Sequence, residues 1–270
     1  MIPFAEFPNQ MLEPIRGVFT DIDDTLTTDG KLSASAYTSM ELLQKNGILV
    51  IPITGRPAGW CDSIARIWPV DAVVGENGAF YFRYDSQARQ MIRHFVDSEK
   101  DRENNKARLR LIAREILTKV KGSGISADQA YRETDLAIDF CEDVSRLPRE
   151  SIEKIVEIMS GFGMTAKVSS IHVNGWFGHY DKLTMTKICM QECFGTDLAQ
   201  NEAKFLFTGD SPNDGPMFEY FSNSVGVANV REFGDELNPP KYVTESRGGE
   251  GFSEVASAIL AAKNILPRLT

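Results

Sequence analysis

Two pairs of carboxylates have the types and the spacing to do chemistry. Asp21 and Asp23 are two residues apart, at the end of an apolar run that starts at Ile15. Asp210 and Asp214 follow a second apolar segment, KFLFT at residues 204–208. Carboxylates this close repel one another unless they share a proton or a cation. Four of them with few neighbouring bases favour a hard divalent cation such as Mg²⁺, bound through oxygen.

A third polar cluster, Thr54-Gly55-Arg56, follows the apolar segment ILVIPI at residues 48–53. It offers a hydroxyl, a flexible backbone amide and a cation, a set that suits an anion. Each cluster taken singly could be a turn or a helix cap, because Asp and Thr are common there. Since all three occur in order on successive strand–helix units, we favour a site that holds a metal ion and an anion.

The elements that must position these clusters alternate between strand and helix. In open α/β sheets, ligands bind just outside the carboxyl ends of the strands, which is where the three clusters stand. Ser33 is a suitable N-cap for the first helix, and Gly47 lies just past its end. We expect strands at 15–22, 48–53, 72–74, 204–208 and 224–227, and helices at 33–46, 59–67, 183–194, 215–221 and 251–264.

The middle of the chain breaks this alternation. Residues 80–84 and 91–96 resemble paired strands, and residues 101–121 form a charged helix whose apolar stripe is Leu109, Ile112, Ile116 and Val120. A strand at 136–141, a helix at 148–162 and one or two strands at 165–173 follow. The sequence therefore predicts a parallel-sheet domain, residues 1–85 and 181–270, split by an α+β insertion at residues 86–180.

Composition excludes several other classes of protein. The 270 residues carry 29 Lys and Arg against 38 Asp and Glu, a formal charge of −9 that disfavours a nucleic-acid-binding face. No stretch approaches about 18 uninterrupted apolar residues, so we expect no membrane span. The first residues lack a signal-peptide pattern, and four cysteines make no disulfide framework. We expect a soluble, cytoplasmic protein, a monomer or a homodimer.

Taken together, the motifs resemble those of the haloacid dehalogenase-like phosphohydrolases. The matching segments are DIDDTL at 21–26, ITGR at 53–56, a later lysine and GDSPND at 209–214. The segment GENGA at 75–79 resembles the class with an α/β cap between the second and third motifs, which includes sucrose-phosphate phosphatase, mannosyl-3-phosphoglycerate phosphatase and Cof-type phosphatases. The resemblance implies an α/β fold, a Rossmann-like parallel-sheet core with an inserted α+β cap domain.

The resemblance also implies roles for the motif residues. Asp21 would be the nucleophile and form an aspartyl-phosphate, and Asp23 would be the general acid and base. Thr54, Gly55, Lys182 and Asn213 would bind the phosphate. Mg²⁺ would be held by Asp21, the backbone carbonyl of Asp23 and Asp210, with Asp214 as a ligand or as a partner of one.

Two positions depart from the pattern of the family. Lys182 stands in DKLT, where relatives often have Asn-Lys-Gly, so Lys187 is kept as an alternative. Asp24 stands where many relatives have Gly, and its role is left open.

The part of the site that contacts the leaving group is harder to read from the sequence. Ser170, His172 and Asn174 alternate as on a strand and share one face, which meets either a sugar's hydroxyls or solvent. Arg56 contacts substrate or pairs with a core carboxylate. Further candidates are Asn77, Arg132 and His179, whereas His94 and His179 are also consistent with structural or exposed positions.

The expected function is that of a Mg²⁺-dependent phosphatase acting on a small phosphorylated metabolite, a sugar or glycosyl phosphate. The alternative is a phosphotransferase of the phosphohexomutase type, which uses the same aspartyl-phosphate but returns the phosphoryl group to a sugar. A binding protein on the same scaffold would have lost catalytic carboxylates, and none is lost here.

Overall fold

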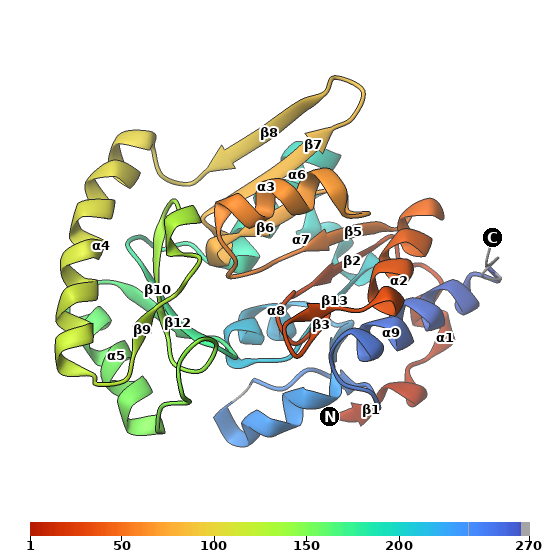
Figure 1. Cartoon of the computed structure of the whole chain (residues 1–270). Coiled ribbons are helices and arrows are strands. Elements are labelled where there is room, and N and C mark those ends of the chain that lie inside the picture. The colour runs from red at the N-terminus through yellow and green to blue at the C-terminus, as the bar shows by residue number, and fades with distance from the viewer. Residues whose placement is uncertain (237, 266–270) are drawn as a thin grey trace.

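Six parallel strands form the central sheet of the computed structural model, which describes residues 1–236 and 238–265 (Figure 1). Their spatial order is β1 (Ile2–Pro3), β15 (Tyr242–Val243), β14 (Ser224–Gly226), β13 (Phe205–Gly209), β2 (Gly17–Thr20) and β5 (Leu49–Pro52). The expected strands β2, β5, β13 and β14 are confirmed. The two-residue strands β1 and β15 were not expected, because they are too short to show a pattern.

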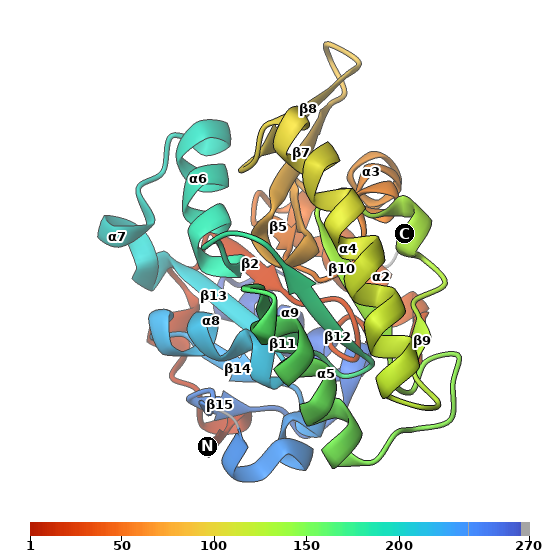
Figure 2. The same cartoon turned by 90° about the vertical axis from the view of Figure 1, so that its left-hand side faces the viewer.

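Helices cover both faces of this sheet, as Figures 1 and 2 show. Val18 and Val50 point to one face, where they pack with α1 (Asn9–Leu12), α2 (Ala34–Lys45), α3 (Ala58–Ile67) and α9 (Gly248–Ala262). Phe19 and Ile51 point to the other, toward α6 (Lys182–Phe194), α7 (Leu198–Asn201) and α8 (Gly215–Tyr220). The predicted N-cap of α2 is confirmed, because Ser33 Oγ accepts the Ala36 amide at 3.2 Å.

Strand β6 (Val73–Gly75) leaves the expected pattern. It touches the parallel sheet through one isolated bridge, between Ile53 and Val74, and pairs antiparallel with β7 (Phe80–Asp85). Strand β8 (Gln90–Phe95) pairs with β7 along its whole length, and the hairpin projects at the top of Figure 1. A boundary after residue 85 would therefore divide a continuous hairpin.

A second unit lies between β8 and α6 and is called the insertion below. Its antiparallel sheet has the order β11 (Thr165–Val168), β12 (His172–Trp176), β10 (Asp135–Asp139) and β9 (Gly124–Ile125). Helices α4 (Glu99–Lys119) and α5 (Arg149–Gly161) pack on it. The predicted stripe of α4, continued by Val120, is buried in a separate hydrophobic core with Ile138 and Ile155.

Short elements complete the chain. A small hairpin, β3 (Thr27–Thr28) with β4 (Lys31–Leu32), follows the first acidic motif. Single turns of 3₁₀ helix include η2 (Glu76–Gly78), η3 (Gln129–Tyr131) and η5 (Pro212–Asp214), and η6 (Ala228–Glu236) precedes β15. Within residues 1–236 and 238–265, no helix combines the length and apolar character needed to cross a bilayer.

Candidate active site

Three buried carboxylates meet at the carboxyl ends of neighbouring strands. Thr20 of β2 pairs with Thr208 of β13, so Asp21 and Asp210 leave the sheet side by side. Asp214 reaches the same place from η5. One carboxylate oxygen from each of the three lies within 4.8 Å of the others. Three of the four carboxylates expected from the motifs therefore cluster in the fold, whereas the Asp23 carboxylate pairs with Arg56 instead.

Lys182 is the cation in contact with this cluster. Its Nζ donates to Asp21 Oδ1 at 2.6 Å and to Asp214 Oδ1 at 2.7 Å. It opens helix α6, whose N-cap is Asp181. Gly78 has a φ of +105°, and a side chain there would lie 2.0 Å from the Asp181 carbonyl oxygen, so glycine lets the loop pack beneath the start of α6. The alternative, Lys187, lies outside the site, with Nζ 4.1 Å from the Tyr220 ring centroid.

Charge in this cluster is unbalanced. Burial raises the pKa of Asp21 and of Asp210, and the neighbouring carboxylates raise both further. Burial lowers the pKa of Lys182, but Asp21 and Asp214 outweigh this and raise it above its usual range. One ammonium thus faces three carboxylates in a place that water hardly reaches. An oxygen-only donor set with excess negative charge fits a divalent cation such as Mg²⁺.

Neighbouring groups orient the two carboxylates of the last motif. Asp214 Oδ2 accepts the amides of Asp210 at 3.0 Å and Ser211 at 3.3 Å. Asp210 accepts from Thr25 Oγ1 at 3.2 Å and from Asn229 Nδ2 at 3.1 Å. Sequence reasoning missed Asn229, which lies far beyond the motif in η6 and has no motif of its own.

Two of the expected phosphate-binding residues, Gly55 and Asn213, border the same cleft. Gly55 and Asn213 line a small cavity with Asp21 and Asp23. Thr54 is buried, and its hydroxyl accepts the Arg56 amide at 3.0 Å. These residues come from three separate segments that meet beside Asp21.

Asn77 lies against Gly55 rather than on the surface. Its side chain is buried, and its Nδ2 has no hydrogen-bond partner among the described residues. A Cβ at Gly55 would lie 3.2 Å from that nitrogen. The spare donor of Asn77 is therefore available close to the cleft.

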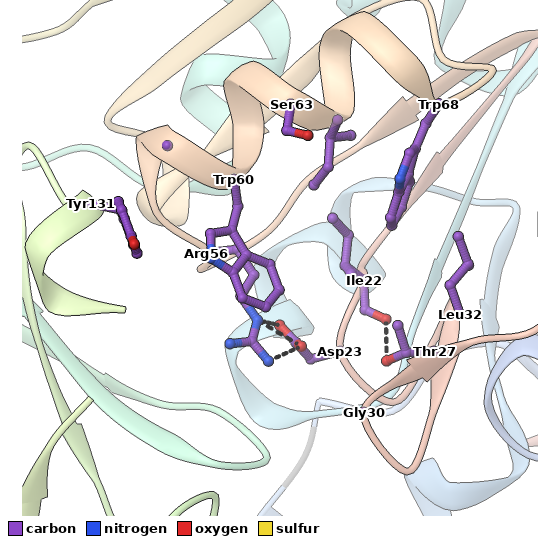
Figure 3. Close-up of a pocket in the computed structure, with 12 residues that line it drawn as sticks. Ile22, Asp23, Thr27, Gly30, Leu32, Arg56, Trp60, Ser63, Trp68 and Tyr131 are labelled. Carbon is purple, nitrogen blue, oxygen red and sulfur yellow. Dashed lines mark hydrogen bonds and ion pairs between the residues drawn. The ribbon is translucent and has the colours of Figure 1, made fainter. Parts of the chain in front are cut away.

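Arg56 pairs with carboxylates on both sides of the cleft. Its Nε lies 2.9 and 3.0 Å from the two oxygens of Asp23, as Figure 3 shows. Its other nitrogens reach Glu142 at 2.9 Å and Asp128 at 3.4 Å in the insertion. Of the two expected roles for Arg56, the structure shows the pairing with a core carboxylate.

The strand face that carries His172 and Asn174 is buried. Both residues line the small cavity with Ser170 and Arg132. His172 Nε2 is 2.9 Å from Glu142 Oε2, and Asn174 Nδ2 donates to Asp135 at 2.9 Å. The solvent-facing alternative for this face is therefore wrong.

The other two histidines lie away from the cavity. His179 is exposed. His94 is 3.1 Å from Glu192 and stacks on Tyr81. His179 therefore has the exposed position that was one of its two expected alternatives, and it is not among the residues that line the cavity.

Two buried residues tie the insertion to the core. Arg132 binds both oxygens of Asp128 and of Asp135, and it donates to the Gly55 carbonyl at 2.9 Å. Glu76 accepts the Ala58 amide of α3 at 2.9 Å and the Thr134 amide of the insertion at 2.6 Å. The sequence identifies this loop by its GENGA motif, but the motif does not show which groups Glu76 contacts.

Asp24 lies where the core loop meets the insertion. It has a φ of 57°, and its backbone carbonyl accepts from Asn229 at 3.0 Å. Burial raises the pKa of its carboxyl, and a hydrogen bond with Ser170 opposes that rise. Asp24 therefore contacts the rim of the cavity without joining the three clustered carboxylates.

Residues 18–106 match the sequence profile of the haloacid dehalogenase-like hydrolases. That segment holds Asp21, Asp23, the Thr54–Arg56 cluster and Glu76. This stretch of the chain is similar to that family. Of the three clustered carboxylates, Asp21 lies in the matched segment, directly after β2, whereas Asp210 and Asp214 lie beyond it.

Similarity to known proteins extends over most of this hydrolase. A phosphoglycolate phosphatase of Methanospirillum hungatei JF-1 is 26% identical over 89% of this chain and 95% of its own length. A solved structure from Thermoplasma acidophilum has a TM-score of 0.67 at 18% identity, covering 93% of this chain and 99% of that one. The sucrose-phosphatase of Synechocystis sp. PCC6803, in complex with sucrose and phosphate, has a TM-score of 0.61 at 16% identity, covering 90% and 97%.

Proposed function

We propose that this hydrolase is a Mg²⁺-dependent phosphatase of small phosphomonoesters, in particular sugar or glycosyl phosphates, acting in the cytoplasm. The observation that carries the proposal is the contact of Lys182 with Asp21 and Asp214, beside Asp210. This arrangement combines a nucleophile, a fixed cation and an oxygen site for a metal. The phosphoglycolate phosphatase and sucrose-phosphatase relatives support a phosphoric monoester as the substrate.

Asp21 and Asp210, with the backbone carbonyl of Asp23, are the groups that would hold Mg²⁺. Asp214 already has both oxygens engaged, one by Lys182 and one by two amides, so it orients its neighbours. When bound, Mg²⁺ would offset the charge of the carboxylates and of the transferring phosphoryl group.

Asp21 would act as the nucleophile. A carboxylate oxygen of Asp21 attacks phosphorus as the bond to the leaving oxygen breaks, which gives an aspartyl-phosphate and an alcohol. Lys182 holds the Asp21 side chain in place and neutralises part of the phosphate charge. Gly55 and Asn213 border the cleft, Thr54 and Asn77 lie next to Gly55, and all four would donate to phosphate oxygens.

Asp23 would serve as the general acid and then as the general base. It gives a proton to the leaving oxygen, and in the second step it takes one from the water that attacks the aspartyl-phosphate. In the structure its carboxylate is paired with Arg56, so the side chain must leave this pair to reach the leaving oxygen. We expect the pair to open when substrate enters.

The insertion would act as a cap over the cleft. Arg132, His172 and Asn174 line its inner face, and the cavity they enclose with the core is only about 10 Å³, the space of one water. Closure of this kind excludes water from the reacting phosphate. Because β8 belongs to the core hairpin, we place the cap between residue 96 and residue 181.

Release of phosphate from a panel of phosphomonoesters tests the proposal. The panel contains hexose phosphates and phosphoglycolate, with Mg²⁺ or with EDTA, and compares wild type with Asp21→Asn. Asp101→Asn is the matched control, because Asp101 is exposed at the start of α4. We expect Mg²⁺-dependent release that disappears in Asp21→Asn and persists in Asp101→Asn.

Other outcomes would contradict parts of the proposal. No release from any ester would refute the phosphatase function. Retained activity in Asp21→Asn would exclude Asp21 as the nucleophile. A hexose phosphate that is isomerised without release of free phosphate would establish the phosphohexomutase type of transfer instead.

A further inference from the structure

A second, larger cavity lies on the other side of the Asp23–Arg56 pair. Its volume is about 480 Å³, and Asp23 and Arg56 line both this cavity and the small catalytic one. Its other walls come from three parts of the chain: Leu32 of the β3–β4 hairpin, the α3 segment from Trp60 to Trp68, and Tyr131 of the insertion. We call it the aromatic pocket.

Flat aromatic side chains dominate this pocket. Figure 3 shows Trp60 between Tyr131 on one side and Trp68 with Leu32 on the other. Trp60 is 43% exposed and Tyr131 is 59% exposed, although burying such side chains would be favourable. Two of the three tryptophans of the chain line the pocket, whereas Trp176 is buried elsewhere. Exposed aromatic faces around a concave site are typical of a place that binds a ligand.

The pocket is connected to the chemistry through one guanidinium. Arg56 Cζ lies 4.4 Å from the Trp60 ring centroid, and the same guanidinium is 2.7 Å from Asp23. Trp60 and Asp23 therefore flank a single side chain. A leaving group that takes its proton from Asp23 would begin at the edge of the aromatic pocket.

The small catalytic cavity cannot hold the organic part of a sugar phosphate. Its volume of about 10 Å³ is that of one water, while the aromatic pocket is of the size of ligand sites in general. With the insertion in its observed place, the organic part of a larger ester has to extend past Asp23.

We infer that the aromatic pocket is the subsite for the organic part of the substrate, a sugar ring that packs its C–H face on Trp60. The inference rests on the proposed phosphatase function, and it adds where the organic part of the substrate binds and that Trp60 determines specificity for it. A sugar ring has an apolar C–H face that suits the negative face of an indole, and hydroxyls at its edge. Ser63 and Tyr131 supply hydroxyls at the rim of the pocket.

The test compares esters with and without a ring. Wild type and Trp60→Ala are assayed with hexose phosphates and with phosphoglycolate, and the ratio of the two kcat/KM values is taken. We expect Trp60→Ala to lower this ratio about tenfold, mainly through the KM for hexose phosphates, and Trp60→Phe to lower it less. Ser63→Phe, which fills the pocket from an exposed helix position, should lower the ratio as well.

Controls separate this role from a structural one. Phe162 is also 43% exposed but lies outside the pocket, at the end of α5, so Phe162→Ala should leave the ratio unchanged. If Trp60 only supported Arg56, both esters would lose activity equally and the ratio would stay constant. A constant ratio in Trp60→Ala and Ser63→Phe would overturn the inference while leaving the phosphatase function intact.

Binding without turnover provides an independent readout. In Asp21→Asn, glucose 6-phosphate should change the tryptophan fluorescence in a saturable way, and this change should weaken in an added Trp60→Phe. Wild-type activity on phosphoglycolate but on no hexose phosphate would overturn the sugar subsite. If Trp60→Ala lowered kcat/KM more for 4-nitrophenyl phosphate than for hexose phosphates, the pocket would bind an aromatic leaving group and not a sugar. No activity on either class, with no fluorescence change, would refute the function and the subsite together.

Discussion

The two walls of the catalytic cleft hold charge in opposite ways. On the core wall, Lys182 is, within the part of the chain that the structure describes, the one ammonium in contact with the cluster of three buried carboxylates, Asp21, Asp210 and Asp214. On the insertion wall, each carboxylate has a basic partner within 3.4 Å. We define this wall by the carboxylates of the insertion at the cleft and their basic partners, one of which, Arg56, reaches them from the core: Asp128, Asp135, Glu142, Arg56, Arg132 and His172.

This difference indicates which wall is built around a ligand. Buried charge without a counter-charge is costly, so the excess on the core wall has to be offset by a bound cation or by a proton on one of the carboxylates. The insertion wall is complete as it stands. His172, followed by Arg56, lowers the pKa of Glu142 to about 2, as expected for a carboxylate that remains charged and paired. Variants of the insertion wall should therefore affect stability first, and variants of the core wall should affect turnover and metal binding.

The largest effect is expected from Arg132→Met, on stability. The Arg132 side chain is 1% exposed and binds two buried carboxylates; this change leaves Asp135 without a cation and Asp128 with only Arg56, 3.4 Å away. Breaking such a pair costs about 3–5 kcal/mol of unfolding free energy, measured by urea denaturation. The matched control is Arg66→Met, which breaks an exposed pair with Asp62 and should cost about 1 kcal/mol or less. Equal losses in the two variants would contradict the description of the insertion wall.

Lys182→Met should lower kcat by roughly 10²–10³, because it removes a fixed positive charge beside the reacting phosphate. Lys187→Met serves as the control, since that ammonium lies on the Tyr220 ring, and its kcat should be unchanged. Phosphate release at saturating substrate gives both values. If Lys187→Met were the more damaging change, the assignment of the third motif would be wrong.

Mg²⁺ should stabilise the folded protein through the core wall. At a concentration one hundred times its Kd, the expected gain in unfolding free energy is about 2.7 kcal/mol. Urea denaturation with Mg²⁺ or with EDTA measures it. Asp210→Asn should abolish most of the gain, whereas Asp101→Asn should keep it. A gain that survives in Asp210→Asn would place the metal elsewhere.

The last and most gradual effect concerns Glu76, which joins the core to the insertion. Burial raises the pKa of this carboxyl from 4.5 to about 7, and the Asp135 charge adds to the rise. Between these two values the folded state binds more protons than the unfolded state, so the contribution of Glu76 to stability falls as pH rises. The slope is at most about 1.4 kcal/mol per pH unit.

Comparison with Glu76→Gln isolates this contribution, because glutamine does not titrate. The wild type should lose unfolding free energy relative to the variant as pH rises from 4.5 to 7. The opposite slope would mean that the amides of Ala58, Glu133 and Thr134 hold the carboxylate more strongly than burial disfavours it.

The sequence by itself determined four strands of the central sheet, β2, β5, β13 and β14, and most of the acidic cluster. Both depend on local patterns: apolar runs mark buried strands, and polar residues at their ends come together because parallel strands share one edge. The Ser33 cap and the apolar stripe of α4 are equally local, and both are confirmed. Lys182 could be chosen over Lys187 because the resemblance implies a lysine before a helix, and Lys182 has that position at the end of the insertion.

Only the tertiary structure decided which groups face one another. A strand pattern shows that His172 and Asn174 share a face, but the same pattern serves a face in water and a face over a cleft. Arg56, Glu76 and Asn229 take partners from segments far away in the chain, and no local spacing encodes such contacts. The aromatic pocket also depends on segments that are far apart in the chain. Leu32, Trp60 and Tyr131 form one cavity only after the β3–β4 hairpin, α3 and the insertion have packed together.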